Sequence, residues 1–146
     1  MQTGMYIIFA LLIGVISSIY MPMNAAVAKH LGSSLTASIS FYFVAFITAV
    51  VLFALFGEHE TIYKFKSVPP YLYLTGVVSA FIVFSITFLI PIIGVRKLTT
   101  LTIAGSILTA MIVSHFGMLA SPVDPITFKK VAGATLLFIG AVISVT

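Results

Sequence analysis

The residues of this chain that could carry out acid–base or metal chemistry are few and lie outside its apolar stretches. Its three carboxylates, Glu58, Glu60 and Asp124, all fall in short polar segments, and His115 stands at the end of an apolar stretch. The chain has no cysteine, which excludes disulfides and thiolate ligands. The spacing shows no nucleophile with its base, no metal-ligand set and no glycine-rich phosphate loop. We therefore predict a protein that is not an enzyme and has neither cofactor nor metal.

Asn24 is the first polar residue of interest, because it follows Pro22 by two residues within an apolar stretch. A proline removes a backbone donor and frees the carbonyl one turn earlier, so the helix bends and polar groups can become accessible. The Asn24 amide both donates and accepts hydrogen bonds. It could contact a substrate or a gate, or it could bond to another helix, and the sequence leaves both open. Pro91 affects a later stretch in the same way, as a hinge or as a terminator.

Small polar residues mark the fourth apolar stretch. Ser106, Ala110 and Ser114 recur every four residues, and such a stripe either lets helices approach closely or lines a cavity. His115 could relay protons, or it could extend to the membrane interface. The candidates for a substrate pathway are Asn24, Ser40, Ser106, Ser114 and His115, with Pro22 and Pro91 as candidate hinges.

One face of the fifth apolar stretch carries Gly133, Leu137, Gly140 and Ser144. Small residues allow two helix backbones to approach closely in lipid, where van der Waals packing replaces the hydrophobic driving force. We expect this face to supply part of a dimer contact.

The elements that must position these residues are membrane helices. Of the 146 residues, 61% are hydrophobic and 7% charged, and the mean hydropathy is +1.26. A soluble domain is about a quarter charged, so this chain lacks a water-facing surface. The net charge of +4 comes without a basic cluster, which argues against a nucleic-acid partner.

Five apolar stretches are long enough to span a membrane, which takes about 20 residues each. They are apolar on every face instead of alternating, which favours helices over β-barrel strands. The sequence predicts an all-α polytopic bundle in a single transmembrane domain over residues 1–146, surrounded by membrane lipids. Its helices are expected at residues 5–28, 34–56, 71–93, 98–116 and 127–145.

The basic residues are divided almost evenly between the two sides of the membrane. Four lysines fall in the second and fourth connections, and Lys29, Arg96 and Lys97 fall in the first and third. Positive charge marks the cytoplasmic side, but four against three is almost no bias. The chain either places its N-terminus inside with a weak preference or inserts in both orientations.

The order and spacing of several short motifs resemble the half-size, YdcZ-type (EamA-like) branch of the drug/metabolite transporter (DMT) superfamily. Met21-Pro22-Met23-Asn24-Ala25 and Ser40-Phe41 lie in the first two stretches. Further matches are Pro70-Tyr71 with Gly76, Ile90-Pro91-Ile92-Ile93-Gly94, Ala104-Gly105, His115-Phe116-Gly117, Pro125, Lys129-Lys130, Gly133 and the Gly140 region.

The chain departs from the family pattern at several polar positions. Tyr20 and Ser106 stand where the family often has glutamine, Ser114 stands where it often has an acid, and the region of Val44 lacks the glycine that it favours. Among the family's polar positions, Asn24 is the one that this chain keeps most clearly.

The resemblance implies one half of a ten-helix, inverted-repeat fold with the substrate cavity between the halves. Together with the absence of a carboxylate in the apolar stretches, it favours a secondary transporter of a small, neutral or amphipathic metabolite in the bacterial cytoplasmic (inner) membrane. Together with the odd number of spans and the balanced basic residues, it favours an antiparallel homodimer, or a heterodimer with a sister five-helix subunit. Two alternatives stay open: a subunit that flips a lipid-linked group, and a membrane scaffold that transports nothing.

Overall fold

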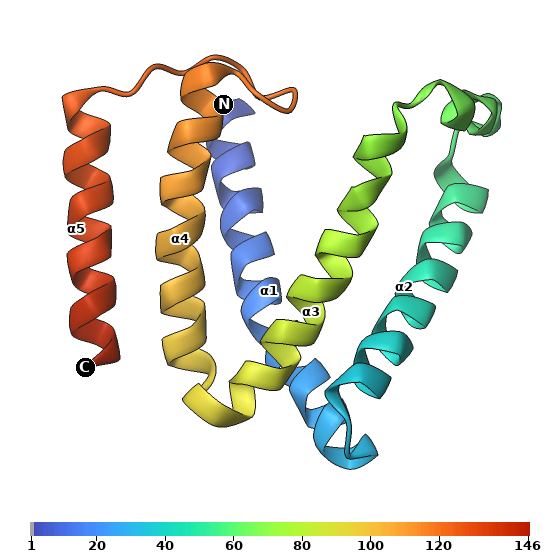
Figure 1. The fold of residues 1–146 in the computed structure, drawn as a ribbon. Coiled ribbons are helices and arrows are strands. Elements are labelled where there is room, and N and C mark those ends of the chain that lie inside the picture. Colours follow the sequence, from blue (N-terminus) through green and yellow to red (C-terminus); the bar gives the residue numbers. More distant parts are fainter. Residues whose placement is uncertain (1) are drawn as a thin grey trace. The chain divides into compact units, whose positions relative to one another are not determined.

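The computed structural model describes residues 2–146, and within that range it contains helices and no strand (Figure 1). Five α-helices are connected by turns, by two 3-10 helices and by one longer loop. In chain order the elements are α1 (Gln2–Leu31), α2 (Ser34–Phe56), η1 (His59–Ser67), η2 (Pro70–Tyr73), α3 (Leu74–Ile93), α4 (Val95–Phe116) and α5 (Phe128–Val145).

All five α-helices are long and apolar enough to cross a membrane, which confirms the predicted all-α membrane fold. α1 has 30 residues and therefore extends for about 45 Å, whereas the hydrocarbon core is about 30 Å thick. α5, the shortest, has 18 residues, or about 27 Å. α5 thus about spans the hydrocarbon core, whereas α1 is about 15 Å longer than the core is thick.

Two helix boundaries differ from those expected from charge. α1 continues through Lys29 and His30, and α4 begins at Val95, so that it includes Arg96 and Lys97. The breaks occur instead at Gly32 and Gly94, whose φ angles of +68° and +83° lie in the left-handed region. A charged side chain at a helix end can extend to water, whereas a positive φ ends the helical hydrogen bonding.

The hydrophilic segment between α2 and α3, one of the polar connections of the sequence, folds into η1 and η2. The Tyr73 hydroxyl donates a hydrogen bond of 2.6 Å to the Phe65 carbonyl, and the two rings stack with centroids 6.3 Å apart. This contact ties η1 to η2 and fixes where α3 begins.

The chain forms two compact units, each described by itself. The N-terminal unit extends to Ile92 and holds α1, α2 and α3, while the C-terminal unit, Ile93–Thr146, holds α4 and α5. Each unit is built around a helical hairpin, α1–α2 in one and α4–α5 in the other. In Figure 1, α1 and α2 diverge from their turn at Gly32 like the arms of a V.

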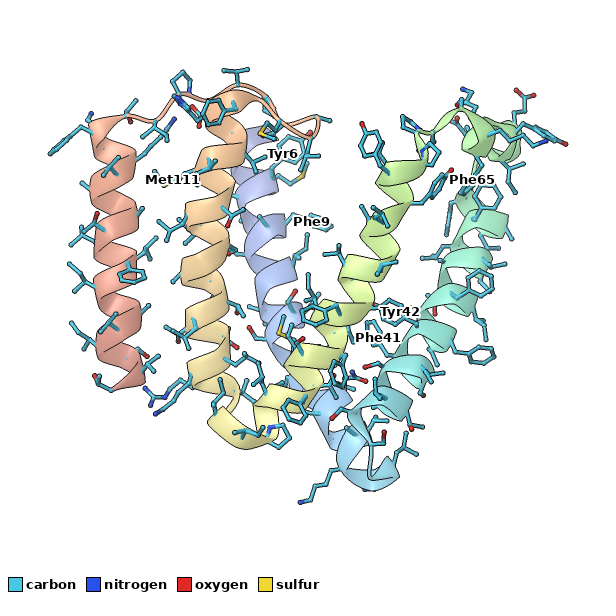
Figure 2. All side chains as sticks on the ribbon, viewed as in Figure 1. Tyr6, Phe9, Phe41, Tyr42, Phe65 and Met111 are labelled. Carbon is cyan, nitrogen blue, oxygen red and sulfur yellow. The ribbon has the colours of Figure 1, made fainter. Side chains whose placement is uncertain are left out.

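The residues buried within each unit are mainly small. Ala25, Ala28 and Ala37 are buried in the N-terminal unit, and Ala104, Ala134 and Ala141 in the C-terminal unit. Large apolar side chains point outward around every helix (Figure 2). Small residues inside and large apolar residues outside are the arrangement expected in lipid, where small residues allow close helix contact and large ones meet the acyl chains.

Candidate functional site

A buried hydrogen bond connects α1 and α3 in the N-terminal unit. Asn24 Nδ2 lies 2.6 Å from Thr87 Oγ1, and the two side chains are only 8% and 1% exposed. Asn24 precedes the end of α1 by seven residues, and Thr87 precedes the end of α3 by six. Both groups therefore lie about 10 Å inside the helix ends, within the membrane-spanning segments.

The Thr87 hydroxyl determines how the Asn24 amide is oriented. Thr87 Oγ1 donates its one hydrogen to the Val83 carbonyl at 2.7 Å, so it can only accept from Asn24. The amide must therefore present Nδ2 to Thr87, and its Oδ1 is left as an acceptor with no hydrogen bond among the described residues. The hydrogen bonds from Asn24 to Thr87 and from Thr87 to Val83 thus hold the Asn24 Nδ2 donor in place and leave the Asn24 Oδ1 acceptor without a partner among the described residues.

Asn24 also borders a groove between α1 and α2 with a volume of about 370 Å³. Tyr20, Ser40, Phe41 and Val44 line it as well. The Tyr20 and Phe41 rings stack with centroids 6.0 Å apart and an interplanar angle of 21°. The structure therefore brings together two of the expected pathway residues, Asn24 and Ser40, and adds an aromatic wall beside them.

Both candidate hinges lie next to this hydrogen-bonded pair. Pro22 precedes Asn24 by two residues within α1, and Pro91 follows Thr87 by four residues within the last turn of α3. Because proline has no N–H, Pro91 cannot donate to the carbonyl of Thr87. A second, wider hollow of about 680 Å³ is bordered by both prolines and by Lys29.

A second polar contact holds α3 in place, this time against α2. The hydroxyls of Tyr42 and Ser79 are 2.6 Å apart. Figure 2 shows Phe41 and Tyr42 next to each other on α2, and their rings meet edge to face at 5.2 Å. One turn of α2 thus contacts α1 through Phe41 and α3 through Tyr42.

The pathway candidates of the C-terminal unit have local partners. Ser106 Oγ donates to the Ile103 carbonyl at 2.8 Å, within its own helix. Ser114 Oγ lies 3.3 Å from Ser121 Oγ, in the connection to α5. His115 is exposed, and its Nδ1 accepts a hydrogen bond from the backbone N–H of Ile126 at 3.2 Å. Ser114 and His115 thus bond to the α4–α5 connection, whereas Ser106 does not.

The expected dimer face of α5 is only partly taken up by contacts within the chain. Gly133 and Gly140 are exposed, and a Cβ on either would meet nothing within 4 Å. Leu137 is 52% exposed and, with Gly140, lines a groove toward α4. At the end of the face, the carbonyl and hydroxyl of Ser144 both accept hydrogen bonds from Arg96 of α4.

Sequence reasoning missed the groups that hold the site together, chiefly Thr87, Tyr20, Tyr42 and Ser79. Thr87 had one available signal, its position four residues before Pro91, where a carbonyl loses its donor. Tyr20 lies four residues before Asn24 and so on the same face of α1. Nothing in the spacing indicates that Tyr42 meets Ser79, because that contact depends on how two helices cross.

Charged side chains stay away from the groove. The carboxylates lie outside the five α-helices, where Glu58 precedes η1, Glu60 lies within it, and Asp124 pairs with Lys130 beside α5. The groove itself offers hydroxyl, amide and aromatic groups. Chemically it can accept or exchange hydrogen bonds and pack against flat apolar surfaces, without any group that would bind a cation by charge.

Comparison with known proteins gives one family match. The family model for DMT-type YdcZ proteins, described as "Putative inner membrane exporter, YdcZ", matches residues 5–143, which is nearly the whole chain. No curated protein and no solved structure matches the chain significantly.

Proposed function

We propose a specific transport cycle for this chain, which belongs to the YdcZ family of inner membrane exporters. Membership supports a multi-pass membrane transporter, as the resemblance indicated. In our proposal the protein is a secondary-active exporter of a small, neutral or amphipathic metabolite in a bacterial cytoplasmic membrane. It works by alternating access as a dimer.

The observation that carries this proposal is the uncharged polar site inside an apolar helical unit. Ionisable residues within membrane spans are costly and are found mostly where they bind ions or relay protons. The groove beside Asn24 contains hydroxyl, amide and aromatic groups but no carboxylate. A neutral solute needs only such groups, whereas a cation exchanged for a proton would need a buried acid.

A dimer would provide the walls that one chain lacks. Transporters with inverted repeats place their substrate near the bilayer midplane, between two halves of opposite orientation. Five is an odd number of spans, so two copies reproduce an inverted repeat only when they insert in opposite orientations. The nearly even division of basic residues between the two sides is compatible with such insertion.

The hinges of the proposed cycle are Pro22 and Pro91. Each proline interrupts the backbone hydrogen bonding of its helix, so the segments beyond it can tilt at low cost. The Asn24–Thr87 bond connects the two helices next to these points. Breaking and re-forming this bond would couple the bend in α1 to the bend in α3.

Reporter fusions test the dimer, and flux measurements test the transport. We expect C-terminal reporters that are active only inside or only outside the cell to give comparable signals. We also expect liposomes containing the protein to move a metabolite chosen from a thermal-shift screen. Signal from one reporter alone would exclude the antiparallel homodimer and leave a sister subunit as partner. A complete absence of flux across the screened metabolites would contradict export.

A further inference from the structure

The groove between α1 and α2 combines a fixed acceptor with an aromatic wall, and this combination specifies a ligand. We propose that it binds a flat, largely apolar solute through one N–H or O–H group that donates to Asn24 Oδ1. This inference rests on the proposed export function, whose substrate class it narrows.

The hydrogen bonds of Thr87 fix the orientation of the Asn24 amide and therefore the position of its acceptor, Oδ1. Thr87 uses its only hydrogen on Val83, so Asn24 must keep Nδ2 on Thr87 and Oδ1 away from it. Asn24 as a whole is 8% exposed, and Oδ1 is not among the fully enclosed atoms, so a ligand in the groove that Asn24 borders can reach it. In the membrane an unpaired acceptor is unfavourable, and a ligand that donates a hydrogen bond relieves this cost.

The shape of the groove sets the size and surface of the ligand. A volume of about 370 Å³ lies at the lower end of the range usual for small-molecule sites. The stacked rings of Tyr20 and Phe41 offer a planar aromatic surface, which favours another flat ring in offset contact. Val44, on the α2 side, completes the apolar wall.

Two other hydroxyls at the groove, those of Tyr20 and Ser40, do not determine whether the remaining groups of the ligand are donors or acceptors. The Tyr20 and Ser40 hydroxyls have no hydrogen bond to another described residue, and each can donate or accept. Asn24 Oδ1, by contrast, can only accept. One donor on the ligand is therefore required, while further polar groups are optional. A lipid acyl chain could fill the same volume, but it has no donor for Asn24.

A matched pair of probes separates this site from simple partitioning into lipid. Indole is flat and carries one N–H, and 1-methylindole has nearly the same shape but lacks that donor. The chain has no tryptophan, so indole fluorescence can be followed without tryptophan emission from the protein. Both probes are titrated against the full chain in lipid nanodiscs, with empty nanodiscs as the blank.

We expect the wild-type protein to bind indole about threefold to tenfold more tightly than 1-methylindole, the value of one hydrogen bond. Asn24→Leu should bring this ratio close to one, whereas Thr87→Val, which keeps the Asn24 oxygen but no longer orients it, should lower the ratio only in part. Equal affinities for the two probes in the wild type, or a ratio that survives Asn24→Leu, would overturn the proposal.

A second pair of variants tests the location even if Asn24→Leu does not fold. Val44→Phe fills the groove, whereas Val51→Phe adds the same bulk to an exposed position of the same helix outside it. Indole affinity should fall about tenfold in the first variant and stay unchanged in the second, and equal effects would place the site elsewhere. If binding depends on the donor but no flux is found, the export proposal is refuted and the groove remains a binding site. If flux is found but binding does not depend on the donor, export stands and the binding proposal is refuted.

Discussion

The two helical units of this protein place their polar contacts differently. In the N-terminal unit, Asn24 and Thr87 join two helices about 10 Å inside their ends. In the C-terminal unit, polar contacts between elements gather at the two ends of the hairpin, with Arg96 on Ser144 at one end and Asp124 on Lys130 beside the other. The stretch between those ends is packed through alanines.

This difference suggests that the two units have different functions. A polar group buried in the membrane interior is unfavourable unless it is bonded, and polar groups within spans often mark the sites where a protein binds or moves something. Small residues along a hairpin, by contrast, give close and stable packing without polar groups. We infer that the N-terminal unit carries recognition and movement, and that the C-terminal unit mainly supplies a stable surface for assembly.

The largest effect should come from Asn24→Leu. We expect it to lower flux about tenfold or more, because it removes the only fixed acceptor of the groove. Thr87→Val is the matched comparison: it breaks the same hydrogen bond but leaves the Asn24 oxygen, so it should lower flux less than Asn24→Leu. Both variants should lose about 0.6 kcal/mol in unfolding free energy, the mean for hydrogen bonds between membrane helices, and at most about 1.7 kcal/mol. Flux assays and reversible unfolding in mixed micelles measure the two quantities. An equal loss of flux in both would show that Asn24 acts only through α3.

The next effect concerns assembly through the C-terminal unit. Gly140→Leu should weaken association on the order of tenfold, equal to about 1.4 kcal/mol, because the new side chain keeps a partner helix at a distance. Within the chain a Cβ at Gly140 meets nothing within 4 Å, and Gly140→Ala therefore serves as a milder variant that the monomer accommodates. Gly14→Leu in α1 has equally open surroundings and serves as the control. Molecular mass by light scattering in mild detergent is the measurement, and an unchanged mass for Gly140→Leu would remove α5 from the interface.

A smaller effect is expected where α2 meets α3. Tyr42→Phe removes the hydrogen bond to Ser79 and should reduce stability by about 0.6 kcal/mol, with part of the ring packing retained. Tyr6→Phe is the control, since Tyr6 is 64% exposed and its hydroxyl has no hydrogen bond among the described residues. Thermal unfolding followed by circular dichroism distinguishes the two variants. A Tyr6→Phe variant as unstable as Tyr42→Phe would show that this contact contributes nothing specific.

The smallest effect should come from the carboxylates. Asp124→Asn breaks the exposed ion pair with Lys130, and such pairs contribute about 0.2–1 kcal/mol, less at high salt. Flux should be retained in this variant, and also when Glu58 and Glu60 are changed to glutamine. The same liposome assay tests this. Loss of transport in Asp124→Asn alone would mean that the α4–α5 connection takes part in the cycle.

Much of the fold follows from the sequence alone. Hydropathy is a local property, and a helix rises by a constant amount per residue, so five apolar stretches predict five spans directly. The small-residue faces, such as that around Gly140, are visible in the same way, because a helix repeats every 3.6 residues. Asn24 stood out because an amide beside a proline is unusual in an apolar stretch.

The partners of these residues were decided by the tertiary structure. Whether Asn24 meets Thr87, and whether Tyr42 meets Ser79, depends on how the helices rotate and cross, to which residues distant in sequence contribute jointly. The orientation of the Asn24 amide depends in turn on a hydroxyl 63 residues away that has already used its hydrogen. The sequence by itself determined the number of spans, the absence of carboxylates within them and the position of the Asn24 amide in α1. Only the tertiary structure turned that position into an acceptor beside an aromatic wall, because hydrogen-bond direction is a property of pairs of groups and not of single residues.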